Sequence, residues 1–400
     1  MTGASKPQFA RRRPRSLSDY FYDPKTRGVV LQILVALLLV YFISEIVSNT
    51  IRNLEEQGIA SGFDFLDRTA GFDISQSLIP YSNTMTYARA FLVGLLNTLL
   101  VAVLGIILAT LIGFVIGVAR LSKNWLIRTL AGVYIETLRN IPPLLMLFAV
   151  YFGVLKNLPA PRKSLELPFS SFLNVRGLYV PAPQWEAGMS VVVAAIAAAI
   201  LGIVFLNWRA RRIRIQTGAL KPVLLPSLLL LVGLPLATFL AMGMPVSFDI
   251  PELGRFNLKG GMVVLPEFIA LLAGLTLYTA AFIAEIVRSG ILSVPKGQSE
   301  AAAALGLKEN HAMRLVIIPQ ALRVIIPPLT NQYLNLTKNS SLAVAIGYPD
   351  LVSVFAGTVL NQTNQAVEVI LITMGVYLTI SLLTSVLMNW FNARMALVER

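Results

Sequence analysis

Apolar residues are gathered in long continuous stretches along this chain, separated by shorter polar segments. A helix needs about 20 apolar residues to cross the hydrocarbon layer of a bilayer. Prolines and polar residues interrupt the third and the seventh stretch. The eight stretches cover residues 28–48, 90–118, 130–156, 189–207, 222–243, 263–287, 324–346 and 366–390. This pattern predicts an all-α polytopic membrane protein with about eight transmembrane helices.

Lysine and arginine gather in alternate connections between these stretches, and such clusters mark cytoplasmic loops. With eight spans, every basic cluster lies on the cytoplasmic side, together with both termini. The outward loops, 49–88, 158–188 and 244–262, are mixed and nearly balanced in charge. The cytoplasmic clusters contain Arg11–Arg13, Arg15, Lys25, Arg27, Arg120, Lys123, Arg128, Arg209, Arg211, Arg212, Arg214, Lys221, Arg288, Lys296, Lys308, Arg314, Arg323, Arg394 and Arg400.

The composition agrees with a membrane protein and narrows the chemistry. Hydrophobic residues make up 56% of the chain and charged residues 13%, where a soluble protein has about a quarter charged. A net charge of +13 would suggest nucleic-acid binding in a soluble protein. In a membrane protein the positive-inside rule accounts for this net charge. We therefore expect the chain to be surrounded by membrane lipid and not to bind nucleic acid. Cysteine is absent and His311 is the single histidine, which argues against metal, disulfide and charge-relay chemistry.

A polar, alanine-rich segment, "KGQSEAAAALGLKENHAMRLVIIPQ" (296–320), separates the sixth and seventh spans. Ser299 can cap a first short helix, and Glu300 would lie in its first turn, where the helix dipole favours a negative charge. Residues 301–304 are alanines, which are strong helix formers. Gly306 supplies the left-handed residue that ends the helix, and a second helix resumes two residues later. The sequence predicts two short helices hinged at a glycine, with an ordinary interfacial loop as the alternative.

Ionisable residues inside membrane spans are candidates for function because burying them is costly. Glu136 and Arg139 lie three residues apart on one face of the third span, and a mutual ion pair is the structural alternative to a functional role. Pro142 and Pro143 are expected to break the helix just beyond, where freed backbone carbonyls can line a cavity.

The seventh span carries "NQYLNLTKNSS". Asn331, Asn335 and Lys338 fall at i, i+4 and i+7, which places them on one helical stripe. A lysine this deep needs an acidic partner. The α-carboxylate of a passing substrate would serve, and pairing with Glu285 or with an acid of a partner subunit is an equal alternative.

Other polar residues of the spans have more ordinary interpretations. Ser340 and Ser341, next to Asn339, can cap a restarted half-helix and make the seventh span discontinuous. Glu285 is expected to face Arg288, and Asn97, Thr98 and Tyr278 are interpreted as packing residues. Polar side chains of this kind commonly hydrogen-bond between membrane helices and need not bind a ligand.

The residues of 296–320 carry a resemblance to a known family. "EAAAALG", followed by nine residues and "VIIP", resembles the EAA loop of ABC importer permeases, with Val316 and Ile318 where Ile and Leu are usual. "YIETLRNIPPLLMLFAVYFG" resembles the other signature of the polar amino acid permeases, although Asn140 stands where Gly is frequent and Met146 near a frequent Gln. The resemblance covers residues 88–156 and 262–392. The extra first span and the insertion 158–260 are similar to permeases of general L-amino acid uptake systems of Gram-negative bacteria.

The resemblance implies a type I ABC importer permease in a bacterial inner membrane. Its partners would be a cytoplasmic ABC ATPase dimer, a second homologous permease in a heterodimer, and a periplasmic amino-acid-binding protein. No phosphate-binding loop G-x-x-x-x-G-K-[ST] occurs, so ATP and Mg would be bound by the ATPase, and no cofactor or metal is expected in this chain. The residues expected to couple the ATPase are Glu300, Ala301, Ala302, Gly306, Leu307 and Pro319. The candidate translocation path is Asn331, Asn335, Lys338, Asn339, Ser340, Ser341, Glu136 and Arg139.

The expected organisation places two parts of a permease core around an insertion. A stand-alone secondary transporter or channel is the alternative function, and it predicts an inverted repeat and carboxylates at mid-membrane. Neither is evident in the sequence. The expected parts are a basic tail 1–27, an extra span 28–48, an outward loop 49–87, core parts 88–157 and 262–392 with the coupling loop 290–320, an insertion 158–261 with two spans, and a C-terminus 393–400.

Overall fold

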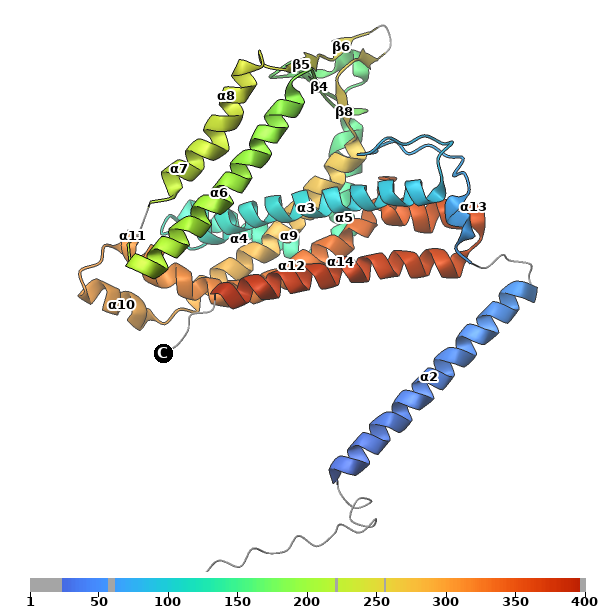
Figure 1. The fold of residues 1–400 in the computed structure, drawn as a ribbon, viewed down its shortest axis with the longest axis horizontal. Helices are drawn as coiled ribbons and strands as arrows, with labels where there is room; N and C mark the ends of the chain where they lie inside the picture. Colours follow the sequence, from blue (N-terminus) through green and yellow to red (C-terminus); the bar gives the residue numbers. More distant parts are fainter. Residues whose placement is uncertain (1–23, 57–61, 220–221, 255–256, 396–400) are drawn as a thin grey trace, which may run out of the picture.

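The computed structural model describes residues 24–56, 62–219, 222–254 and 257–395. The arginines of the basic tail (11–13 and 15), Lys221 and Arg400 lie outside these residues. Long helices dominate the chain (Figure 1). They are α2 (Pro24–Glu56), α3 (Tyr87–Ala119), α4 (Trp125–Arg139), α6 (Met189–Thr217), α9 (Pro266–Leu292), α12 (Ile318–Asn339) and α14 (Ala366–Met395). The shorter helices are α5 (Pro143–Phe148), α7 (Leu224–Leu228), α8 (Leu234–Ala241), α10 (Lys296–Ala304), α11 (Glu309–Ala312) and α13 (Leu360–Thr363).

The core of the molecule is built from α3, α9, α12 and α14. α3 lies along α9, and α12 packs against both α9 and α14. Glycines allow the close approach of α3 to α9: a Cβ at Gly113 would lie 2.6 Å from Ile283, and one at Gly117 would lie 2.6 Å from the carbonyl oxygen of Ala284. Small residues four apart let membrane helices pack backbone to backbone. These contacts hold together the core helices that carry the candidate site.

The third predicted span is two helices and not one. α4 and the segment Pro143–Asn157, which contains α5, meet at an angle of 110°. The break falls at Pro142 and Pro143, as predicted, because proline removes a helical donor and restricts the residue before it. Seven helices of the described residues are long and apolar enough to cross a membrane, or eight if the bent pair counts as one span. The predicted all-α membrane protein is confirmed.

The insertion carries β-structure that the hydropathy pattern did not predict. Four strands form an antiparallel sheet in the order β1-β2-β3-β8, with Phe172 opposite Tyr179 and Tyr179 opposite Val263. β4 pairs with β5, and β6 with β7, in two-stranded sheets. The strands are β1 (Leu165–Leu167), β2 (Ser171–Asn174), β3 (Gly177–Val180), β4 (Ala182–Trp185), β5 (Val246–Asp249), β6 (Glu252–Leu253), β7 (Leu258–Lys259) and β8 (Met262–Val264). β8 leads directly into α9, so the sheets stand at one end of the core (Figure 1).

The helical segment between the seventh and the eighth predicted span, η8 (Val352–Val359) with α13, was not predicted either. α12 continues as a 3-10 helix, η7 (Ser340–Ile346), and the chain then turns through Gly347, whose φ is +77°. The π-helical segment η8 and α13 follow before α14 begins. η8 packs against α3 and α14. We call this end of the core, with the turn 347–351, the far end, and the end with α10 and α11 the coupling end.

Candidate functional site

The coupling segment, residues 296–320, forms two short helices joined at a glycine, as predicted. α10 ends in a Schellman arrangement: the amide of Leu307 donates to the carbonyl of Ala302 at 3.1 Å, and that of Gly306 to Ala303 at 2.9 Å. Gly306 has φ +75°, and no atom lies within 4 Å of a Cβ placed there. Its backbone conformation, and not crowding, is therefore what requires glycine.

Two local predictions for α10 are wrong. The helix begins at Lys296 after Pro295, and the Ser299 hydroxyl donates to the carbonyl of Lys296 at 2.7 Å instead of capping an amide. Proline at the N-cap position starts the helix four residues earlier than a cap at Ser299 would. Glu300 consequently lies in the second turn and not in the first, so the helix dipole acts on it less.

The coupling segment is tied to the core by few contacts. Ala302 and Ala312 are its buried small residues. The amide of Gln320 donates to Gln298 at 3.0 Å, joining α12 to α10. Lys123 and Glu309 form an ion pair of 3.3 Å, but both side chains are more than four-fifths exposed. Such a pair contributes little to stability.

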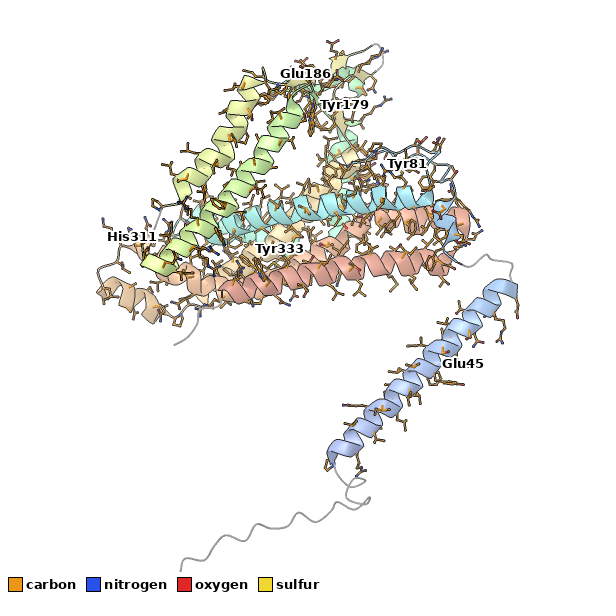
Figure 2. The ribbon with its side chains drawn as sticks, viewed as in Figure 1. Glu45, Tyr81, Tyr179, Glu186, His311 and Tyr333 are labelled. Carbon is orange, nitrogen blue, oxygen red and sulfur yellow. The ribbon has the colours of Figure 1, made fainter. Side chains whose placement is uncertain are left out.

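Most of the segment's surface is free within this chain. Glu300, Ala301 and Gly306 are exposed, whereas Leu307 and Pro319 are half-buried. Leu305 is 82% exposed and Leu315 is 61% exposed. Figure 2 shows His311 at this end of the molecule and Tyr81 at the opposite end. The segment therefore presents a compact surface with exposed apolar residues at the coupling end.

The predicted polar stripe of α12 is present on the outside of the chain. Asn331, Asn335 and Lys338 are all exposed. Lys338 and Ser341 line a groove of about 430 Å³ between α12 and α14, together with Tyr377. Among the described residues, no ion pair includes Lys338, and Glu285 is paired with Arg288. The alternative pairing of Lys338 with Glu285 is therefore wrong.

The predicted helix restart at Ser340 and Ser341 is also wrong. The Ser340 hydroxyl donates to the carbonyl of Thr337, and that of Ser341 to Lys338, each at 2.7 Å. Both hydroxyls thus bond back to the preceding turn, as serine does inside a helix. The helix tightens into η7 without a break, and Asn339 is half-buried beside it.

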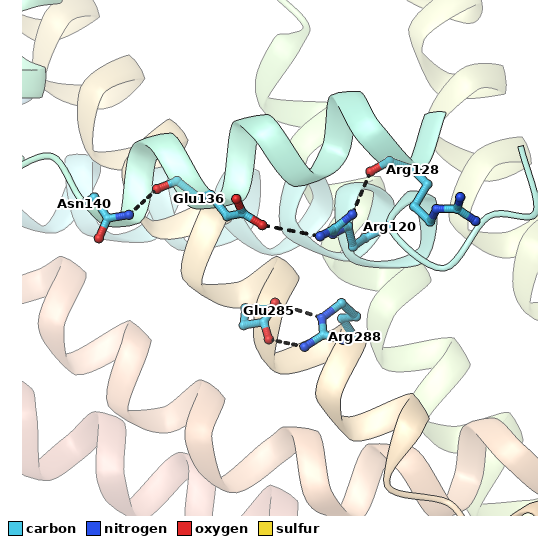
Figure 3. A network of polar contacts seen from close by, with 6 residues as sticks. All are labelled: Arg120, Arg128, Glu136, Asn140, Glu285 and Arg288. Atoms are coloured by element: carbon cyan, nitrogen blue, oxygen red, sulfur yellow. Dashed lines mark hydrogen bonds and ion pairs between the residues drawn. The ribbon is translucent and has the colours of Figure 1, made fainter. Parts of the chain in front are cut away.

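The ionisable residues of α4 and α9 form a small polar network (Figure 3). Arg120, at the end of α3, donates to Glu136 at 3.4 Å and to the carbonyl of Arg128 at 3.1 Å. Arg288 donates to Glu285 at 2.9 Å, as predicted. Arg139 lies over the ring of Phe282, 5.5 Å from its centre.

The predicted Glu136–Arg139 pair is therefore wrong, and the reason is the close approach of α3 and α4. The guanidinium of Arg120 crosses Gly132, where an added Cβ would lie 2.7 Å from its Cζ atom. Glycine leaves room for this arginine to reach Glu136. The contact is weak, because the Glu136 side chain is 73% exposed.

A buried polar cluster at the far end was missed by the sequence reasoning. Its members come from α3, the turn 347–351 and α14, and we call it the far-end cluster: Asn97, Thr98, Tyr348, Asp350 and Tyr377. The first four are fully buried. The Asn97 amide donates to the carbonyl of Pro349 at 2.9 Å, and the Thr98 hydroxyl accepts from the amide of Leu351 at 2.9 Å. The prediction of Asn97 and Thr98 as packing residues is confirmed.

Asp350 is the unexpected member of this cluster. It accepts from the amide of Ser353 at 2.8 Å and from the Tyr377 hydroxyl at 3.4 Å. The carboxylate therefore caps the start of η8 from a buried position. The only sequence signal is the acid in "GYPDL", between two apolar stretches. Burial with capping geometry makes it an anchor of the fold.

Comparison with known proteins assigns the part of the chain that carries the coupling segment and the polar stripe to one family. Residues 105–397, which include the coupling segment and the polar stripe, match the family described as "Binding-protein-dependent transport system inner membrane component". The chain belongs to this family. It is thus a multi-pass inner-membrane permease subunit, and the predicted family is confirmed.

Three relatives are similar to this permease over nearly its full length. The general L-amino acid transport system permease protein AapQ of Rhizobium johnstonii is 56% identical over 96% of both chains. The putative amino-acid ABC transporter permease protein YhdX of Escherichia coli is 53% identical, over 95% of this chain and 97% of the relative. The glutamate/glutamine/aspartate/asparagine transport system permease protein BztB of Rhodobacter capsulatus is 44% identical, over 96% and 97%.

Proposed function

We propose that this permease subunit carries L-amino acids in an ATP-driven importer, by alternating access from a periplasmic binding protein to the cytoplasm. The observation that carries the substrate class is similarity over nearly the full chain to AapQ and BztB, whose names state amino-acid transport. A separate ATPase dimer would bind ATP and Mg and hydrolyse the nucleotide. A heterodimer with a second homologous permease completes the membrane part.

The coupling segment is the proposed contact with the ATPase. Exposed Leu305 and Leu315 supply apolar area for docking, and Glu300 supplies a charge for a basic residue of the ATPase. Few contacts hold the segment to the core, so a pull on it can be transmitted through α12 without first breaking a large interface. The other proposed coupling residues form the two short helices and the turn between them: Ala301, Ala302, Gly306, Leu307 and Pro319.

The polar stripe of α12 is the proposed wall of the translocation path. Asn331, Asn335 and Lys338 would face hydrocarbon if lipid surrounded this side of α12, at a large cost for the charged lysine. Contact with the companion permease, across a polar path, removes that cost. Lys338 would then meet the α-carboxylate of the substrate or an acid of the companion. Asn339, Ser340 and Ser341 follow this stripe along the chain, and Glu136 and Arg139 of α4 complete the proposed path.

The orientation follows from the basic residues. Arg209, Arg211, Arg288 and Arg394 all lie where the spans end on the coupling-end side, so this side is proposed to be cytoplasmic, with both termini. The sheets of the insertion then lie on the periplasmic side, where the binding protein approaches.

The test is to purify the chain from its native membrane in mild detergent and to identify its stoichiometric companions. We expect an ATPase and a second permease, and ATP-dependent uptake of labelled L-amino acids after reconstitution with the binding protein. A chain that purifies alone and moves solute without ATP would overturn the proposal in favour of a secondary transporter or channel. Uptake of another solute class by the intact complex would overturn only the substrate.

A further inference from the structure

The inserted helices stand apart from the permease core. α6 packs along α8 and η5 (Leu229–Gly233), and within the described residues neither it nor α8 has more than slight contact with a core helix. Figure 1 shows the hairpin inclined to α3 and α14, with the end that joins β4 and β5 standing away from the core. None of the most apolar part of Leu224–Ala241 is buried. Most of the hairpin's surface is therefore uncovered within the described chain.

α6 is longer than its apolar part. Met189 to Leu206 spans about 27 Å, close to the thickness of the hydrocarbon layer. The helix continues without interruption to Thr217, and its extension carries four arginines within six residues: Arg209, Arg211, Arg212 and Arg214. These lie about 5–12 Å beyond Leu206. Long arginine side chains at this depth reach the phosphate layer of the bilayer.

The four arginines are exposed and free of acidic partners. None of the ion pairs among the described residues includes one of them. Trp208 lies beside them, and the guanidinium of Arg212 stacks on its ring at 4.0 Å from the centre. Stacking fixes the plane of this guanidinium and leaves its edge available for bidentate hydrogen bonds. Trp208, Arg211, Arg212 and Ile215 share one face of the helix, at i, i+3, i+4 and i+7.

We propose that this end of α6, residues 208–215, binds the phosphate headgroups of anionic phospholipids and anchors the inserted hairpin. Arginine matches the geometry of phosphate, and a cluster of basic residues directly after a membrane helix attracts anionic lipid. Trp208 suits the same layer because tryptophan is enriched at membrane interfaces. Ile215, 75% exposed on the same face, adds an apolar contact at the boundary.

The end of α14 offers a matched control. Arg394 stacks on Trp390 at 4.1 Å, with the same spacing of four residues as Arg212 on Trp208. In the described part of the chain, the last turns of α14 carry this single arginine, whereas the end of α6 carries four. The tryptophan–arginine stack is thus common to both ends, and the arginine cluster distinguishes α6.

The test is native mass spectrometry of the purified complex with equal amounts of phosphatidylglycerol and phosphatidylethanolamine of the same acyl chains. Wild type is expected to retain phosphatidylglycerol preferentially. Changing all four arginines to glutamine should reduce that preference at least tenfold, and Arg212→Gln alone about fivefold, which is about the factor for one basic residue of a cluster that attracts anionic lipid. Arg394→Gln should change it less than twofold.

Several results would overturn the proposal. One is an unchanged lipid preference in Arg212→Gln and in the fourfold variant, and another is an equal loss in Arg394→Gln. Displacement of the lipid by inorganic phosphate would assign the arginines to a free anion. Loss of the ATPase from the fourfold variant at unchanged lipid preference would make this end a protein-docking surface. The single variant keeps the test valid if the fourfold variant fails to insert.

Discussion

The two ends of α12 are held in different ways. At the coupling end, α12 is joined to α10 by one side-chain bond, Gln320 to Gln298, and an exposed ion pair supports α11. At the far end, η7 packs against α3 and α9, and Asp350 in the turn after it is fully buried with bonds to Ser353 and Tyr377. α12 itself is packed on α9 from Ala321 and Ile325 onward, so a firmly held helix joins the loosely held coupling segment to the anchored far end. Such a helix can transmit force, because its far end is fixed in the core while the coupling segment is free to move.

The largest effect is expected from a change at the anchored end. A Cβ at Gly94 would lie 3.1 Å from the Cα of Leu351 and 3.2 Å from the carbonyl oxygen of Asp350, so backbone would have to shift. Gly94→Leu should lower the free energy of unfolding by about 3 kcal/mol, the upper end of the usual cost of overpacking. Recovery and Tm of the purified chain measure this. Gly375→Leu is the control, since nothing lies within 4 Å of a Cβ there; equal loss in both variants would contradict the anchor.

At the loosely held end, Gly306→Pro should leave assembly intact and abolish stimulation of ATP hydrolysis by the loaded binding protein. Proline cannot adopt a positive φ and has no amide to bond to Ala303, so α11 must change direction. Gly306→Ala should lose stimulation only in part, because a left-handed alanine costs about 1 kcal/mol. Wild-type stimulation in the proline variant would remove the coupling role.

A smaller effect is expected from Lys338 in the last turn of α12. Lys338→Ala should reduce amino-acid uptake about tenfold, the value of a hydrogen bond to a charged group, and leave the recovered complex unchanged. Lys338→Arg, which keeps the charge, should retain more uptake. A Lys338→Ala chain that no longer assembles would mark a structural lysine.

The smallest effect is expected from the exposed ion pair of the coupling end. Glu309→Gln should change stimulated ATP hydrolysis by less than about twofold, because solvent screens the pair with Lys123. A larger loss would mean that the coupling end is held as firmly as the far end, and the contrast between the two ends would fail.

The sequence predicted those features of the fold that depend on a long apolar run or on a short local motif. Apolar runs located the membrane helices, and the segment "AAAALG" located a short helix that is terminated by Gly306, two residues after its last residue, Ala304. Each of these signals lies within one element. The double proline at 142 and 143 likewise predicted the break in the third span, although not its angle of 110°.

The remaining features depend on contacts between distant residues. Glu136 pairs with Arg120 because α3 passes Gly132 closely, and spacing along α4 alone could not indicate that. Asp350 is held by residues from α14 and by its own turn. The strands of the insertion have two to four residues each, too few to form a recognisable alternation. Packing of separate elements, and not local propensity, decides all three.

The most direct measurement of the coupling role uses the absence of cysteine from this chain. A single cysteine for a spin label is introduced either by Leu305→Cys in the coupling segment or by Phe169→Cys in the insertion. The native side chains at these two positions are 82% and 90% exposed. Adding the ATPase subunits should immobilise the label at 305 and leave that at 169 unchanged. Equal mobility of the label at 305 with and without the ATPase would show that the coupling segment does not contact the ATPase.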